Sequence, residues 1–127
     1  VNEIITALSP SHIEGFSLLG GEPFEPENQK DLAELLAKIK RELPDKDIWC
    51  YTGFVFEDIL SGKVGNPETA KMMLQNIDVL VDGKFILEEK SYDLYFRGSK
   101  NQRVIAVKAS LESDKAVAVG GIPNNTL

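Results

Sequence analysis

Gly20-Gly21-Glu22-Pro23 combines residue types that can present backbone atoms to a ligand. Two consecutive glycines can adopt positive φ angles, and they let a ligand approach main-chain carbonyls without meeting a Cβ atom. Pro23 restricts the preceding Glu22 to extended conformations, which holds the carbonyls of this stretch in place. The stretch follows a strand-like run, residues 16–19, and precedes a helical pattern, as ligand-binding turns of α/β proteins do. A plain structural turn explains a Gly-Gly pair equally well, and both interpretations stay open at this point.

Two further turns follow apolar, strand-like runs. Thr52-Gly53 comes directly after residues 47–51, and Asp82-Gly83 comes directly after residues 77–81. Parallel strands place their carboxyl ends at one edge of a sheet, so both turns and the glycine turn are expected on one face. In a parallel α/β sheet, that face is the functional one.

The strand-like runs alternate with helical patterns, which predicts βαβ units. The nearly continuous apolar run at 48–51 is typical of a strand covered on both faces, as in parallel sheets. The expected fold class is therefore α/β, with a partial, open β/α barrel and a mostly parallel sheet. The expected strands are residues 16–19, 47–51, 77–81 and 104–107. The carboxyl ends of all four are expected on one face.

Helices are expected between these strands. The longest starts at Pro26 and ends before Pro44, with an apolar stripe at helical spacing made of Leu32, Leu35, Leu36, Ile39 and Leu43. A short helix begins at Phe56, and another opens at Asn66-Pro67-Glu68. Residues 2–8 are interpreted as the end of a further helix, and residues 116–119 as a short edge strand.

Composition narrows the class of protein. The 127 residues suit a single domain, here residues 1–127, with a core at 1–110 and a tail at 111–127. A net charge of −6 argues against nucleic acid as a partner, and no apolar run is long enough to cross a membrane. No signal peptide is visible, and the single cysteine, Cys50, fits a reducing cytoplasm. The start at Val1, inside a helical pattern, indicates a fragment.

Four motifs in sequence order then resemble one family. They are Gly20-Gly21-Glu22-Pro23, residues 48–53, residues 77–83 and residues 97–103. In this order they are similar to the activating proteins of anaerobic ribonucleoside-triphosphate reductase, which are small radical S-adenosylmethionine enzymes. The resemblance covers residues 1 to about 107.

The resemblance implies a function. Members of this family of glycyl-radical-enzyme activases bind a four-iron–four-sulfur cluster and S-adenosylmethionine. They cleave the latter reductively, with an electron donor such as flavodoxin, and form a glycyl radical on the partner reductase. The cofactor supplies the difficult chemistry, and the protein supplies geometry and electrostatics.

The resemblance also implies which residues meet the cofactor. The backbone carbonyls of Gly20, Gly21 and Glu22, held by Pro23, would receive the methionyl ammonium, which offers only donors. Thr52 is interpreted either as a cofactor contact or as a cap of the next segment. Asp82 is interpreted as a residue that holds a ligand hydroxyl, binds a cation or stabilises a backbone turn. Asn101-Gln102-Arg103 would meet the cofactor carboxylate or the reductase, or would form a polar turn. No catalytic side chain is assigned.

The sequence departs from the family in one respect. The family holds its cluster with a Cys-x3-Cys-x2-Cys loop, and only Cys50 is present here, in a strand where it is expected to be buried. No metal ligand is therefore assigned. The segment that carries the cysteine loop is expected to be missing, and this chain is expected to be inactive alone. One alternative is a non-catalytic module that binds S-adenosylmethionine or a partner protein. Another is a phosphate-binding α/β domain, although this sequence lacks the glycine motifs that such domains usually carry.

Overall fold

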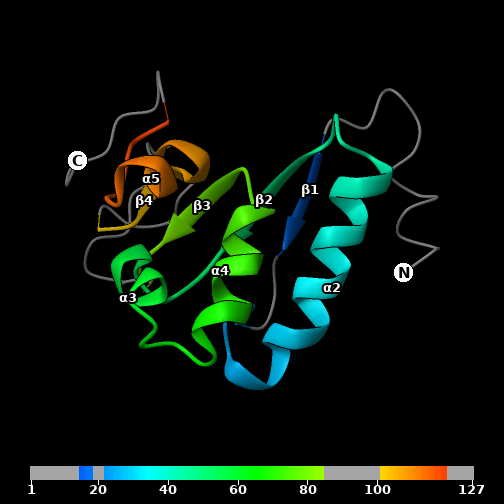
Figure 1. The fold of residues 1–127 in the computed structure, drawn as a ribbon. Helices are drawn as coiled ribbons and strands as arrows, with labels where there is room; N and C mark the ends of the chain where they lie inside the picture. The colour runs from blue at the N-terminus through cyan, green and yellow to red at the C-terminus, as the bar shows by residue number, and fades with distance from the viewer. Residues whose placement is uncertain (1–14, 19–21, 85–100, 120–127) are drawn as a thin grey trace.

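The computed structural model describes residues 15–18, 22–84 and 101–119, which form a four-stranded sheet with helices packed against it (Figure 1). The strands lie in the order β1-β2-β3-β4 and are β1 (Gly15–Leu18), β2 (Asp47–Tyr51), β3 (Val79–Asp82) and β4 (Arg103–Ala106). The helices are α2 (Pro26–Glu42), α3 (Phe56–Leu60), α4 (Pro67–Gln75) and α5 (Val107–Ser113). The expected helix at 2–8 lies outside the described residues.

The first three strands are parallel, and the fourth is not. β1 pairs with β2 and β2 with β3 in parallel, because the connections between them carry α2 and then α3 and α4. β4 runs antiparallel to β3, with Asp82 opposite Arg103. The expectation that all four strands end on one face is therefore wrong for β4, which begins at that edge instead of ending there. Closure into a barrel stays a prediction.

The helix after the glycine turn forms as its pattern predicts. Pro26 stands in the first turn of α2, where its missing N–H costs nothing, and Glu27 lies near the positive end of the helix dipole. Leu36 and Ile39, at the centre of the apolar stripe, have no exposed surface. The helix ends at Glu42, before Pro44, as expected.

The strands β2 and β3 form the centre of the core. Ile48, Cys50 and Leu80 are fully buried beneath the helices, which lie on one side of the sheet in Figure 1. Trp49 and Tyr51 alternate with these residues and are only half-buried. The expectation that β2 is equally covered on both faces is therefore wrong, because its burial alternates with the pleat.

The end of the described chain differs from the expected strand. Val107 was expected in a strand, but it begins the short helix α5, and its N–H donates to the Asp78 carbonyl at 3.1 Å. Ser110 is buried and accepts a hydrogen bond from the Val117 N–H at 2.9 Å, which folds the following segment back onto the helix. An isolated bridge between Ile105 and Ala118 is what remains of the expected edge strand.

Gln29 is a buried polar residue that joins α2 to the loop before α4. Its Nε2 donates to the carbonyls of Phe24 at 2.8 Å and Val64 at 3.0 Å, and its Oε1 accepts from the Asn66 N–H at 3.2 Å. A Cβ atom at Gly65 would stand 2.6 Å from this amide, and Gly65 has a φ of +64°. Only glycine therefore lets the loop lie this close to Gln29.

We predict that Gln29→Met destabilises the fold. The substitution keeps the size of the side chain but leaves buried backbone groups without partners, which costs about 1–3 kcal/mol of unfolding free energy for each unsatisfied group. Urea denaturation followed by circular dichroism measures the loss. Lys30→Met, at an exposed position of the same helix, is the matched control. A loss no larger than that of the control would contradict the role of Gln29.

Candidate functional site

The Glu22 carboxylate ties the end of the glycine turn to the loop after β2. Its Oε2 accepts from the Thr52 hydroxyl at 2.6 Å and from the Phe24 N–H at 3.0 Å. Its Oε1 accepts from the Gly53 N–H at 2.6 Å. A carboxylate that accepts three hydrogen bonds holds its own backbone in a fixed place, because charged acceptors form the stronger bonds.

The backbone carbonyl of Glu22 is also engaged. It accepts from the Glu25 N–H at 3.2 Å and from the Asn28 side-chain amide at 3.1 Å. Pro23 and Phe24, which follow, are buried beneath this turn. Glu22 therefore already uses both its side chain and its carbonyl within the protein.

Thr52 acts as a connector within the same loop. Its hydroxyl donates to Glu22 and accepts from the Phe54 N–H at 3.2 Å, and the residue is nearly buried. This geometry is that of the cap of the following segment, one of the two interpretations of Thr52. A Cβ atom at Gly53 would stand 3.3 Å from Glu22 Oε1, so a glycine suits this close approach.

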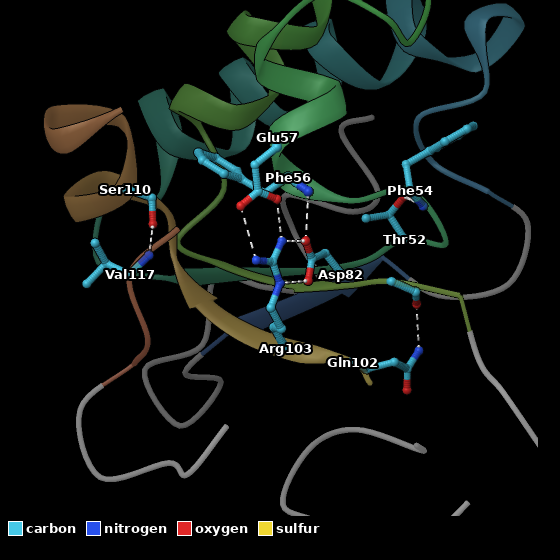
Figure 2. A network of polar contacts seen from close by, with 10 residues as sticks. Thr52, Phe54, Phe56, Glu57, Asp82, Gln102, Arg103, Ser110 and Val117 are labelled. Carbon is cyan, nitrogen blue, oxygen red and sulfur yellow. Dashed lines mark hydrogen bonds and ion pairs between the residues drawn. The ribbon is translucent and has the colours of Figure 1, made fainter. Parts of the chain in front are cut away.

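A second carboxylate, that of Asp82, is fully buried at the end of β3 (Figure 2). It accepts from the Arg103 Nε at 2.9 Å and from Arg103 Nη2, and its Oδ2 accepts from the Phe56 N–H at 2.7 Å. The guanidinium extends further to Glu57, with Nη1 at 3.1 Å and Nη2 at 2.6 Å from its oxygens. One arginine thus bridges a buried carboxylate and a half-exposed one.

Two members of this cluster, Glu57 and Arg103, have shifted pKa values. The hydrogen bond from Arg103 lowers the pKa of Glu57 against an opposing effect of burial. Hydrogen bonding to Asp82, opposed by burial and supported by Glu57, raises the pKa of Arg103. The guanidinium is therefore charged, and the lowered pKa of Glu57 favours its ionised form.

The start of β4 and the end of β3 are joined by side-chain amides. Asn101 Nδ2 donates to the Lys84 carbonyl at 2.7 Å, and Gln102 Nε2 donates to the Gly83 carbonyl at 3.0 Å. The Gly83 N–H in turn donates to the Phe54 carbonyl at 3.0 Å, which links this turn to the loop after β2.

The structure thus brings most of the predicted site residues to one edge of the sheet. Glu22 meets Thr52 directly, and Asp82 meets Arg103, while Asn101 lies in the same turn region. Gly20, Gly21 and residues 97–100 lie outside the described residues. Whether these residues bind a cofactor stays a prediction.

Sequence reasoning did not find Glu57. This residue lies 46 positions before Arg103, and an acid in a first helical turn is common enough to carry no special signal. Only the pairing of β3 with β4, which places Arg103 beside Asp82, brings the guanidinium within reach of α3.

The residues present do not fit a four-iron–four-sulfur cluster. Such a cluster needs several thiolates, and the chain has one cysteine, Cys50. Cys50 is fully buried, and burial, together with the charge of Glu22, raises the pKa of its thiol well above its usual range. The described residues contain no group of three or more His, Cys, Asp or Glu side chains placed to hold a metal ion.

Comparison with known proteins places these features in context. Residues 1–105 match the family model described as a 4Fe-4S single cluster domain. The chain is 38% identical over 104 residues to the anaerobic ribonucleoside-triphosphate reductase-activating protein of Enterobacteria phage T4. The aligned residues cover 82% of this chain and 60% of the relative. The chain is 40% identical over 102 residues to the protein of that name in Haemophilus influenzae, covering 79% and 61%.

A third relative of the same name, from Escherichia coli K12, is 37% identical over 105 residues, covering 81% of this chain and 64% of the relative. The chain therefore spans somewhat less than two thirds of the length of these curated relatives. No solved structure gives a significant match. Within the described part of the chain, no helix has the length and apolar character needed to span a membrane.

We predict that Arg103→Met strongly destabilises the protein. The buried Asp82 carboxylate would lose its cationic partner, and breaking a buried pair from one side costs about 3–5 kcal/mol. Glu57→Gln is the matched control, because the half-exposed pair that it removes contributes only about 0–1 kcal/mol. Thermal and urea denaturation of both variants measure the difference. Equal losses in the two variants would contradict a structural role for the Asp82–Arg103 pair.

Proposed function

Because this chain belongs to the family of 4Fe-4S single cluster domains, we propose that it is the core of a radical S-adenosylmethionine activating enzyme. Its partner would be anaerobic ribonucleoside-triphosphate reductase, the protein that its relatives are named for activating. The reaction proposed for the whole protein is reductive cleavage of S-adenosylmethionine and formation of a glycyl radical on the reductase.

The observation that best supports this proposal is the fixed position of Glu22. Three hydrogen bonds to its carboxylate fix Glu22, the residue that follows Gly20-Gly21 in the sequence, beside the loop after β2. A residue that is held in place before a ligand arrives loses little freedom on binding, which favours affinity. A methionyl ammonium needs carbonyl acceptors. Because the Glu22 carbonyl already accepts two bonds, we assign this task to the carbonyls of Gly20 and Gly21.

The part of the reaction assigned to this chain is binding and orientation. A four-iron–four-sulfur cluster is implied by the family, but the single buried cysteine does not supply its ligands. We therefore propose that these 127 residues bind S-adenosylmethionine and contact the reductase, and that they do not perform the cleavage by themselves. An electron donor such as flavodoxin would serve the whole protein.

The presence of a single cysteine also favours a second function. A chain that holds no cluster could act as a non-catalytic α/β module that binds S-adenosylmethionine or a partner protein. Both functions predict ligand binding at the glycine turn, and they differ in whether a cluster can be assembled with the chain.

We predict that Glu22→Gln weakens the binding of S-adenosylmethionine. An amide cannot accept from the Thr52 hydroxyl, the Phe24 N–H and the Gly53 N–H together, so the turn loses part of its anchor. A loss of about tenfold in affinity, or about 1.4 kcal/mol, is expected. Isothermal titration calorimetry well below the melting temperature measures it. Glu25→Gln, which removes the same charge at an exposed position of the turn, should bind like the parent. Unchanged binding by Glu22→Gln would place the ligand site elsewhere.

We also predict that the chain does not assemble a stoichiometric cluster. Anaerobic reconstitution with iron and sulfide should leave less than one cluster for each chain, because one thiolate is present where three are required. Visible absorbance and iron analysis check this, with Cys50→Ser as the control. A stable cluster that Cys50→Ser abolishes would show that the buried cysteine is a ligand after all.

A further inference from the structure

The outer side of α2 carries charges in an order that is complementary to itself. Two acids, Asp31 and Glu34, come first along the helix, and two cations, Lys38 and Arg41, follow. We propose that this side of α2, together with Met72 of α4, is the surface through which a second copy of this chain binds across a two-fold axis. The two α2 helices then run antiparallel to each other. This inference does not depend on the function proposed above.

An open groove of about 550 Å³ lies at the centre of this surface. It runs along α2, beside α4, and the two helices pack against each other on one side of the sheet (Figure 1). The groove is lined by the four charged residues and by three apolar ones, Leu35, Ala37 and Met72. Met72 is 46% exposed, and in the described part of the chain only Val55 is a comparably exposed large hydrophobic residue. An exposed methionine offers an apolar contact that adapts to its partner.

Helical geometry places the charged residues on one side of α2. Positions 31, 34, 35, 38 and 41 follow one another at intervals of three or four residues, apart from the adjacent pair 34 and 35, so their side chains project in similar directions. Asp31, Glu34 and Arg41 are exposed, whereas Leu36 and Ile39 are fully buried in the core. The charged stripe therefore lies away from the core of this chain.

The charges are symmetric about position 36. Asp31 and Arg41 lie at equal distances from it along the sequence, and so do Glu34 and Lys38. In an antiparallel helix pair whose two-fold axis passes at this level, Asp31 faces the partner's Arg41, and Glu34 faces the partner's Lys38. An ammonium has three donors, so Lys38 can bind the partner's Glu34 beside its interactions within its own chain. Each pairing occurs twice, because a two-fold interface uses the same patch on both copies.

Electrostatics favours both this occupant and its direction. The chain has a net charge of −6, so two copies repel each other over most of their surfaces. The patch on α2 balances two acids with two cations, and two copies can attract each other there. A parallel pair sets Asp31 against the partner's Asp31, which is unfavourable as like-charge contacts are. The antiparallel pair also sets the two helix dipoles in opposite directions.

An exchange of charges tests this interface. Sedimentation velocity of the 127-residue chain at about 100 µM should show dimer in equilibrium with monomer, because a small interface gives modest affinity. Lys38→Glu/Arg41→Glu makes the patch acidic, and Asp31→Lys/Glu34→Lys makes it basic. Each variant alone should associate at least about a hundredfold more weakly than the parent, because like charges then meet. A mixture of the two should recover the dimer, although both proteins stay net negative.

Lys84→Glu/Lys108→Glu is the matched control, because it makes the same change of charge at exposed positions outside α2 and α4. It should dimerise like the parent. Circular dichroism checks the fold of each variant. Asp31→Lys/Glu34→Lys, whose changes avoid both ends of α2, carries the test alone if the acidic variant unfolds.

Three results overturn the proposal. The first is a parent chain that stays monomeric. The second is a charge-exchanged variant that dimerises as well as the control, which places the interface elsewhere. The third is a mixture of two folded variants that does not associate. Loss of the dimer in each variant and its recovery in the mixture support the interface on α2.

Discussion

The buried carboxylate of Asp82 is the constraint on which the functional edge depends. A charge with no exposed surface is tolerated only where it is fully paired, and Asp82 is paired by Arg103 and by the Phe56 N–H. These partners belong to β4 and to the start of α3. The requirement to satisfy one carboxylate therefore fixes where two other elements begin, and it explains why β4 enters the sheet with Arg103 directly opposite Asp82.

Glu22 also joins separate segments through its carboxylate, and it lies nearer the surface than Asp82. Its oxygens bind two backbone N–H groups and a hydroxyl, and they connect the start of α2 to the loop after β2. The Gly83 N–H, bonded to the Phe54 carbonyl, connects that loop to the end of β3. Two carboxylates and one backbone bond thus order an edge made mostly of irregular chain, which is how a rigid sheet positions ligand-binding loops.

The core beneath this edge is made of apolar side chains. Leu36, Ile48, Leu80 and Met73 are fully buried, and the burial of such apolar side chains is the main source of stability in a domain of this size. Cys50 contributes to this core as a small apolar residue. The core of the described chain is therefore built from apolar side chains, and its cysteine packs among them.

The sequence alone determined the local elements and the residues of the edge. The apolar period predicted α2, the prolines marked its ends, and the turns at Glu22, Thr52 and Asp82 were correctly assigned to one edge. Local patterns suffice there, because helix spacing and turn chemistry act within a few residues. Only the tertiary structure decided the antiparallel direction of β4, the helix α5 and the pairing of Arg103 with Glu57. These features depend on which distant segments meet, and a buried charge selects its partner by position in space, not by distance along the chain.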